Sequence, residues 1–199
     1  MSTLCVSDAD LVDRARQGDA AAFGELVDRH RTAVYRAALA ALGSHAEAED
    51  AAQDAFLLAY RRLDSFRGQA SFKTWLLTIA WHQAINRRRT LSRLLRRIVS
   101  PSGTDPEAHD AAVASVAVRV PSPEAAAAHE ELRGAIRRAI GALTPKLRDA
   151  LLLAQSGEYS YEQIGAMLST PVGTIKWRIS EARRLVKRQL IGHGFGDER

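Results

Sequence analysis

The sequence predicts an all-α protein of two small helical domains joined by a flexible linker, the C-terminal domain containing a helix-turn-helix. Three observations predict this fold class. Apolar residues recur every three or four positions through most of the chain, as they do in helices buried on one face. Residues that cap helices precede these periodic stretches. The stretch between the two domains is rich in Pro, Ser, Ala and Val and loses the period.

Composition limits the function classes. The chain has 199 residues, 46% of them hydrophobic, which is enough for one core or two small ones. Its net charge of +5 favours a polyanionic partner, either nucleic acid or an acidic membrane surface. Its single cysteine, Cys5, excludes an internal disulfide and a cysteine-rich metal site. Because we find no signal sequence and no long apolar run, we expect a cytoplasmic protein without membrane insertion.

Three helices are predicted in the first third of the chain, each with its own start signal. Ser7 begins the first, Asp19 caps the second, and Ser44 with Glu47 has the spacing of a capping box before the third. A glycine follows each of the first two helices and provides a stop. The predicted helices cover residues 4–18, 19–43 and 44–63.

The third predicted helix has an acidic flank. Acids concentrate in its first turns, where carboxylates also complement the helix dipole, and no Lys or Arg occurs between Arg36 and Arg61. An acidic flank with a leucine on it indicates a docking surface for a basic protein helix, although a merely solvated face explains the charges as well. The facing Glu-x-x-His motifs of a di-metal bundle are absent, so no metal is expected. The flank consists of Asp50, Gln53, Asp54, Leu57 and Arg61.

The fourth helix, predicted from Phe72 onward, lies in a basic segment. Between residues 65 and 104 there are eight basic residues and no acid, interleaved with aromatic rings. This composition suits single-stranded nucleic acid, which needs cations for its phosphates and flat or polar surfaces for its unstacked bases. Trp75 also fits a place in the core, and Trp81 fits either role. The candidate contacts are Phe66, Arg67, Gly68, Gln69, Ser71, Phe72, Lys73, His82, Asn86 and Arg87.

Residues 99–121 form the predicted linker between domains 1–98 and 122–199. These 23 residues span at most about 76 Å when fully extended. Two turns of duplex take about 70 Å, so the linker is just long enough to connect sites two turns apart. A free chain of this length averages only ~26 Å. A large scaffold would therefore have to hold the linker extended.

The C-terminal domain is predicted to begin with two bracing helices, over residues 122–140 and 144–157. Each starts with a cap residue followed by proline, a pair typical of helix starts. The next helix begins with Ser160 and Gln163, whose spacing predicts a capping box. It forms the first half of the predicted helix-turn-helix.

A proline and glycine break separates the two halves of this motif. Pro171 and Gly173 interrupt the pattern, Gly165 leaves room for a close approach, and the second helix is predicted to begin near Thr174. This helix carries six basic residues and one acid, a net charge of +5 that equals that of the whole chain. A solvated surface helix would show the same charges, but a basic helix behind a capped partner is typical of DNA recognition. The candidate contacts are Thr174, Lys176, Trp177 and Arg178 for base edges, and Arg183, Arg184, Lys187 and Arg188 for phosphates.

The C-terminal motif resembles that of a known family. The stretch from Pro171 to Arg178 is similar to the recognition helix of bacterial RNA polymerase sigma factors of the sigma-70 family, in the extracytoplasmic-function (ECF) group. This chain departs from the family pattern at Trp177, where a small Ser is usual, at Glu181, where a basic or polar residue is commoner, and at Ser169, where the turn often has Gly.

The N-terminal half resembles the same group. Residues 48–56 match an AED-x-x-Q-D-x-F helix, which in that group engages the polymerase clamp. Residues 72–80 match an F-x-x-W-L-x-x-I-A helix, which with the loop before it recognises the downstream promoter element. Together the similar regions cover residues 8–90 and 122–190.

The resemblance implies a factor that directs RNA polymerase core to promoters and assists their opening. It implies an anti-sigma protein as a further partner, and no catalytic residue, cofactor or small-molecule substrate. A stand-alone helix-turn-helix activator or repressor would use the same helix pair but would bind its duplex without polymerase. A nucleic-acid enzyme would need a carboxylate–metal or nucleophile constellation, and we find none. A single fused globule with its arginines covered would contradict the two-site interpretation.

Overall fold

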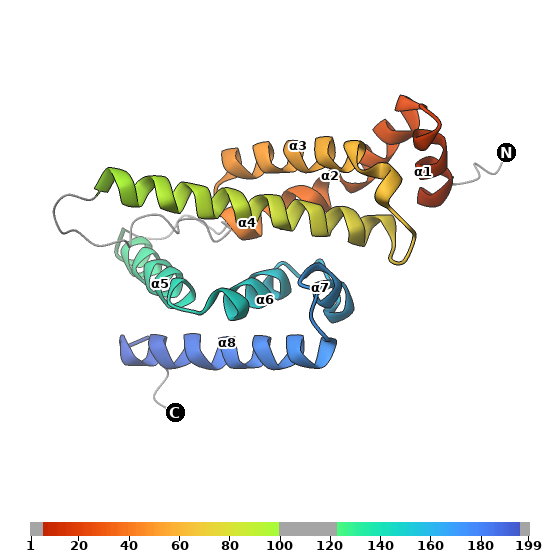
Figure 1. The fold of residues 1–199 in the computed structure, drawn as a ribbon. Coiled ribbons are helices and arrows are strands. Elements are labelled where there is room, and N and C mark those ends of the chain that lie inside the picture. Colours follow the sequence, from red (N-terminus) through yellow and green to blue (C-terminus); the bar gives the residue numbers. More distant parts are fainter. Residues whose placement is uncertain (1–5, 100–122, 196–199) are drawn as a thin grey trace.

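The computed structural model describes residues 6–99 and 123–195 (Figure 1). Within these ranges the regular structure is entirely helical, with no strand, which confirms the predicted fold class. The elements are α1 (Asp8–Arg16), α2 (Ala20–Leu42), α3 (His45–Arg61), the short 3-10 helix η1 (Leu63–Ser65), α4 (Phe72–Val99), α5 (Pro123–Gly141), α6 (Pro145–Gln155), α7 (Tyr161–Met167) and α8 (Val172–Gly192).

Two of the predicted helix starts differ in how completely they form. At α1 the Ser7 hydroxyl accepts a hydrogen bond from the Asp10 amide, and the Ser7 amide donates to the Asp10 carboxylate, both at 3.2 Å, so the capping box is complete. At α3 the Ser44 hydroxyl accepts from the Glu47 amide at 3.5 Å, but the reciprocal bond does not form. The reason is that the Glu47 carboxylate pairs with Arg87 of α4 instead.

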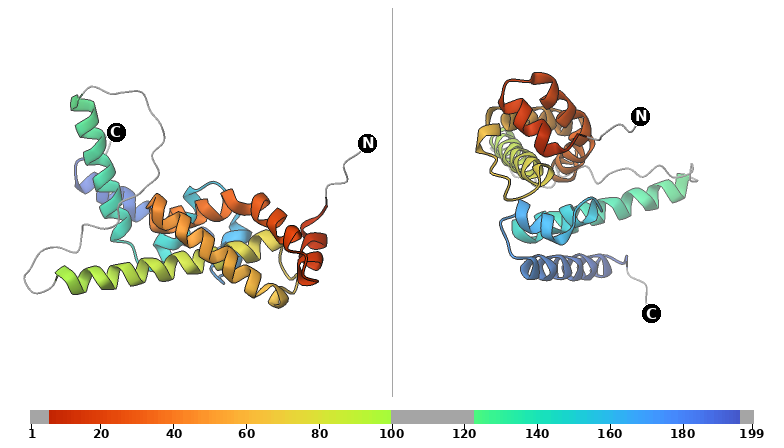
Figure 2. Two further views of the ribbon diagram at one scale, coloured as in Figure 1. Left: turned by 90° about the horizontal axis from the view of Figure 1, so that it is seen from above. Right: turned by 90° about the vertical axis from the view of Figure 1, so that its right-hand side faces the viewer.

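The helices α2, α3 and α4 lie along one another as an N-terminal bundle, and α1 packs against α2 (Figures 1 and 2). Gly43 ends α2 with φ of 73°, the left-handed conformation that glycine adopts without strain. The helix α4 continues to Val99, the first residue of the predicted linker. The rest of the predicted linker lies outside the described residues.

The helix-turn-helix consists of α7, a short turn and α8. A Cβ on Gly165 would lie 2.8 Å from the Thr170 carbonyl oxygen, so the small residue is required by the turn rather than by the crossing of two helices. Ser169 takes the left-handed conformation, with φ of 48°. The helix α8 begins at Val172, two residues before the predicted start, because Pro171 with φ of −57° already occupies the cap position.

The two halves of the chain pack against each other. The helices α6 and α7 lie between the N-terminal bundle and α8, with α7 against α4 and α6 against α2 (Figures 1 and 2). Leu153, Ile164 and Met167 are fully buried and belong to the same hydrophobic cluster as Leu26 and Leu76 of the bundle. The arrangement is therefore a closed one, in which one core crosses the boundary between the halves.

Polar contacts accompany this apolar interface. Arg88 of α4 donates to the Asp149 carboxylate of α6 at 3.0 Å and to the Ala41 carbonyl oxygen of α2 at 3.2 Å. The hydroxyl of Tyr159 donates to the Ala33 carbonyl oxygen at 3.0 Å. A more exposed pair joins Arg36 to Glu158. We call the contact of Arg88 with Asp149 and Ala41 the interdomain latch.

Candidate nucleic-acid interface

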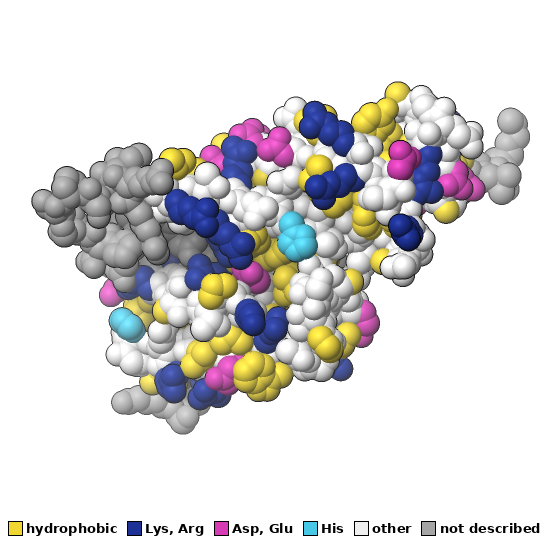
Figure 3. All heavy atoms as spheres, in the orientation of Figure 1, with side chains coloured by type: hydrophobic (Ala, Val, Ile, Leu, Met, Phe, Trp, Pro, Cys, Tyr) yellow, Lys and Arg dark blue, Asp and Glu magenta, His cyan; other side chains and the backbone are white. Residues whose placement is uncertain are grey.

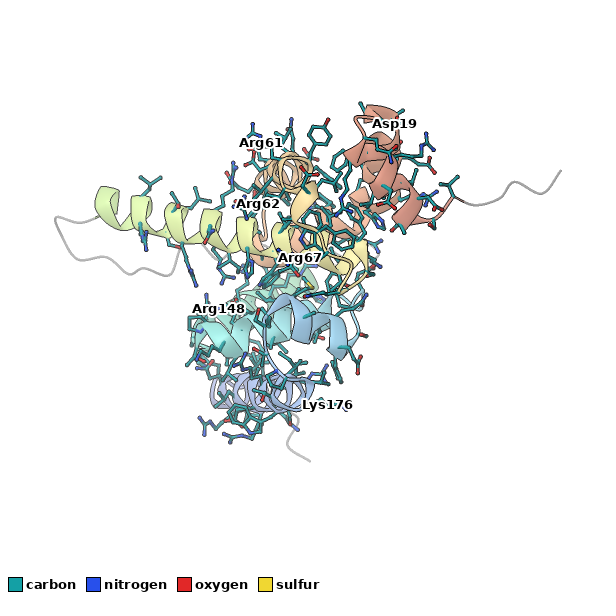
Figure 4. All side chains as sticks on the ribbon, turned by 45° about the vertical axis from the view of Figure 1, so that its right-hand side comes forward. Asp19, Arg61, Arg62, Arg67, Arg148 and Lys176 are labelled. Carbon is teal, nitrogen blue, oxygen red and sulfur yellow. The ribbon has the colours of Figure 1, made fainter. Side chains whose placement is uncertain are left out.

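The helix α8 presents a basic face to solvent. Ile175, Ile179 and Ala182 are buried against the rest of the C-terminal half, which turns the other side of the helix outward. Figure 4 shows Lys176 on α8 at the far edge of the molecule from Arg61 at the end of α3. Outward-facing members of the predicted set are Lys176, Trp177, Arg183, Arg184, Lys187 and Arg188. Although the halves are packed together, these basic residues are therefore not covered.

Two arginines of α8 already have partners within the motif. Arg178 is half-buried and donates from its guanidinium to the Thr170 hydroxyl at 3.1 Å, while that hydroxyl donates to the Leu168 carbonyl oxygen at 2.9 Å. Arg184 forms two hydrogen bonds with Glu181, at 2.6 and 2.8 Å. The bonds between them raise the pKa of Arg184 and lower the pKa of Glu181, so both groups stay charged.

The loop between α3 and α4 rests on a cluster of aromatic rings. Phe72 is only 4% exposed, and its ring packs edge-on against Phe66 at 5.8 Å and at a tilt against Trp75 at 5.7 Å. Phe72 was predicted to contact nucleic acid, but this burial gives it the role of a support beneath the loop. Arg16 of α1 donates to the carbonyl oxygens of Leu63 and Phe66, which fixes the start of the loop.

The remaining loop residues face solvent. Arg67, Gly68, Gln69 and Ser71 are exposed, and Gly68 has φ of 69°, which permits the sharp turn at the centre of the loop. His82 and Asn86 are exposed further along α4, and Lys73 is half-buried. Trp81 is 1% exposed, so the open choice between core and nucleic acid is decided in favour of the core. Basic side chains lie on both halves of the face shown in Figure 3.

Arg87 lies elsewhere than predicted. It was grouped with the downstream nucleic-acid contacts, yet its guanidinium pairs with Glu47, with Asp50 at 2.7 Å and with Asp54 at 3.6 Å, all on α3. These contacts, with Glu47 as the largest contribution, raise the pKa of Arg87. Arg87 therefore joins α4 to the acidic flank instead of facing outward beside the loop.

The acidic flank borders an apolar groove between α2 and α3. Leu57 is 50% exposed, and Asp50 and Asp54 expose 61% and 59% of their side chains. The groove has a volume of about 450 Å³, and its wall is mostly apolar. Its lining includes Phe23, Val27, Tyr35, Gln53, Phe56 and Leu57. Two flank residues, Gln53 and Leu57, thus line an apolar groove that the sequence pattern did not reveal.

Several residues that shape these surfaces were missed at the level of sequence. Arg16 holds the loop, and Arg88, Asp149 and Tyr159 hold the two halves together. Each bond joins residues at least 47 positions apart, so no local spacing signals it. Across residues 6–99 and 123–195, no group of three His, Cys, Asp or Glu side chains is placed to hold a metal ion. No helix in this described part is long and apolar enough to cross a membrane.

Comparison with protein families gives two matches, one in each half. Residues 26–94 match Sigma-70 region 2, and residues 133–186 match Sigma-70 region 4. The first match contains α3, the loop and most of α4, and the second contains α7, the turn and most of α8.

Similar proteins extend over nearly the whole chain. The RNA polymerase sigma-H factor of Pseudomonas aeruginosa is 35% identical over 92% of this chain and 93% of its own. The ECF RNA polymerase sigma-E factor of Escherichia coli is 36% identical, over 93% and 95% respectively. Among solved structures, CnrH in complex with the cytosolic domain of CnrY has a TM-score of 0.60 at 25% identity and covers 93% of this chain and 97% of that one. The sigma factor RpoE of Bartonella quintana, bound to the anti-sigma factor NepR, has a TM-score of 0.60 at 22% identity, over 89% and 98%.

Proposed function

Because the chain belongs to the ECF group of the sigma-70 family, whose members direct RNA polymerase core to promoters, we propose how its surfaces divide that task. The flank of α3 docks on polymerase core. The loop before α4 holds a base of the melted strand, and α8 binds the upstream duplex in its major groove. The observation that carries the proposal is the presence on one chain of an exposed acidic and apolar helix and an exposed cationic recognition helix, within the region 2 and region 4 matches.

Docking through α3 is supported by its chemistry. A partner helix with basic residues around an apolar stripe would place the stripe on Leu57 and in the neighbouring groove, and its cations beside Asp50 and Asp54. Arg87 already neutralises part of this acidic charge, so it also orients the carboxylates before the partner arrives. Opposite charges at the rim of such an interface steer association and fix its register.

Two features of the loop before α4 support capture of the melted strand: its two ends are held in place, and its tip is exposed. The aromatic cluster and the Arg16 bonds fix the two ends, while Arg67, Gly68 and Gln69 are exposed. Backbone groups at a glycine and a side-chain amide can hydrogen-bond a base edge, and an arginine can neutralise a phosphate. A loop whose two ends are held in place and whose tip is small and polar is suited to hold one unstacked nucleotide.

We also propose a protein inhibitor and a cytoplasmic location. In both solved structures named above, the chain similar to this one is bound to a second protein, and for RpoE that protein is the anti-sigma factor NepR. An inhibitor of this kind would act by covering the α3 flank or by stabilising the closed arrangement. The proposed work with polymerase and promoter DNA takes place in the cytoplasm.

The test is transcription in vitro with purified core polymerase on a pool of promoter fragments. We expect the chain to start transcription from a subset of fragments that core alone does not use. Asp54→Arg should lower co-purification with core by about tenfold or more, because it places a cation against a basic partner. Glu131→Arg, which changes the charge equally at an exposed position of α5, should leave co-purification unchanged.

A second variant separates docking from folding. Leu57→Ala removes an exposed side chain without adding charge near Arg87, and it should also weaken co-purification. If both variants bind core as the native chain does, the proposal that the flank of α3 docks on core is wrong. If the chain binds and selects duplex tightly by itself and never needs core, the alternative of a stand-alone helix-turn-helix regulator is correct.

A further inference from the structure

Trp177 is the most exposed large hydrophobic side chain in the described part of the protein. It exposes 61% of its surface, compared with 52% for Ile191 and 50% for Leu57. Among residues 6–99 and 123–195 the indole ring stacks on no other aromatic ring, and no cation lies over it. A single exposed apolar residue is common and does not by itself indicate a function. The position of Trp177 on α8, however, does indicate one.

Trp177 lies in the second turn of α8, on the side away from the buried residues. Ile175 and Ile179, each two positions away along the helix, are 0% and 2% exposed, which places Trp177 on the opposite side. Lys176 and Ser180 are exposed beside it. In helix-turn-helix proteins, the N-terminal residues of the recognition helix contact base edges in the major groove. The indole therefore projects where bases are recognised.

The neighbouring arginines are less suited to that task in this chain. The guanidinium of Arg178 is bonded to Thr170, whose hydroxyl in turn binds the turn backbone at Leu168. Arg184 is held by two bonds to Glu181 on the same helix. A bidentate contact with guanine needs two N–H groups of the guanidinium aimed together at the base. In this structure one nitrogen of Arg178 is bonded toward the turn, and two nitrogens of Arg184 are bonded to Glu181. Base recognition at the start of α8 thus depends more on Trp177 and Lys176 than the charge pattern suggests.

We propose that Trp177 recognises the 5-methyl group of a thymine in the upstream promoter element and that Arg178 is a positioning residue that fixes the turn before α8. Thymine alone among the four bases presents a methyl group in the major groove, and apolar side chains distinguish it by contact. The indole edge supplies such a contact, and the adjacent Lys176 reaches a phosphate or an acceptor atom. The inference rests on the proposed function, since it assigns specificity to the same helix.

The expected size of the effect follows from the buried methyl group. Removing one methyl from an apolar contact lowers binding about fourfold, the equivalent of roughly 0.8 kcal/mol. Two changes should produce it independently. One is uracil in place of thymine in the DNA, which deletes the methyl and keeps the pairing. The other is Trp177→Ala in the protein.

The experiment uses the full chain assembled with core polymerase, because the proposed activity belongs to that complex. Duplexes with a randomised upstream segment are prepared in two versions, one with thymine and one with deoxyuridine, and the bound DNA is sequenced. The native complex should prefer T at one or more positions, and this preference should fall about fourfold in the deoxyuridine pool. Trp177→Ala should lack the preference in both pools, whereas Trp177→Phe should retain it.

Matched variants on the same helix show whether the effect is local. Ile191 lies near the C-terminal end of α8 and is second only to Trp177 in exposure among the large hydrophobic side chains of the described residues. Ile191→Ala should leave the selected sequences unchanged. Lys187→Ala should lower binding to all sequences and flatten its salt dependence, because Lys187 is expected to contact phosphate only. Arg178→Ala should weaken binding and lower the melting temperature together, as expected for a residue that holds the turn.

Three results would overturn the inference. The first is a Trp177→Ala complex that keeps the native thymine preference. The second is a native complex whose preference is the same in both pools. The third is a Trp177→Ala chain that folds but no longer binds core, which would assign the indole to a protein partner. Native transcription from selected promoters together with any of these results would remove this inference and leave the proposed function intact.

Discussion

The interdomain latch gives a prediction with a calculable size. Asp149→Ala removes the carboxylate that faces Arg88, and the two side chains expose only 14% and 15% of their surface. Breaking a buried ion pair by deleting one partner typically costs about 3–5 kcal/mol, because it leaves an uncompensated charge. Here Arg88 keeps its bond to the Ala41 carbonyl oxygen, and part of it stays in water. We therefore expect a smaller cost, about 2–3 kcal/mol.

The cost should fall on the contact between the halves. A change of about 2–3 kcal/mol lowers the ratio of closed to open molecules about 30- to 150-fold. Small-angle X-ray scattering measures this directly, since a compact chain of this length has a radius of gyration of about 16 Å and an opened one is larger. Urea unfolding of the same variant reports the loss of stability.

The double variant Arg88→Met with Asp149→Leu is the decisive control. It replaces the pair by apolar side chains of similar volume, which is often neutral. The free energy of the contact between the halves should then lie within about 1 kcal/mol of its value in the native chain. Glu158→Ala, which breaks the more exposed pair with Arg36, should cost only about 0–1 kcal/mol. If the double variant has as large a radius of gyration as Asp149→Ala, the uncompensated charge of Arg88 is not what separates the halves, and this prediction is wrong.

Three further changes test other parts of the structure. Ser169→Gly should stabilise the chain by about 0.5–1 kcal/mol, seen as a rise in melting temperature, because relief of the left-handed strain exceeds the entropic cost of glycine. Gly165→Ala should cost about 1–3 kcal/mol in urea unfolding, since its Cβ would meet the Thr170 carbonyl oxygen at 2.8 Å. Burial raises the pKa of Tyr159 above its ordinary value of 10.0, so the folded chain keeps the phenol protonated where the unfolded chain ionises it. Stability should therefore fall above about pH 10, less steeply in Tyr159→Phe; equal slopes would contradict this.

Local signals in the sequence were sufficient to predict the helices and their caps. The helix start at Ser7, the capping box at Ser160 and the glycine stop at Gly43 formed as expected, because each depends on residues within a few positions. The capping box predicted at Ser44 formed only in part. Glu47 had a better partner in Arg87, which is 40 positions away and has no place in a local pattern.

Helical periodicity shows that a face is apolar but not what covers it. For this reason Trp81 could not be assigned from sequence, and the packing of α7 on α4 was not predicted. Charge patterns have the same limit. Arg87 and Arg178 both belong to basic runs, yet one is joined to the acids of α3 and the other to the turn before α8. Two departures from the family's usual residues carried local signals that the structure strengthens: Ser169 has a left-handed backbone, and Trp177 is exposed on α8.

The closed arrangement also bears on how the two DNA-binding surfaces would work together. A compact chain of this size is about 40 Å across, whereas elements two duplex turns apart are separated by about 70 Å. Simultaneous contact with both elements therefore requires the α5–α8 half to leave the N-terminal bundle. Polymerase would have to supply the free energy of this opening through its own contacts with the chain. The interdomain latch is one of the contacts that this opening must break, and Asp149→Ala should then lower the core concentration needed for transcription.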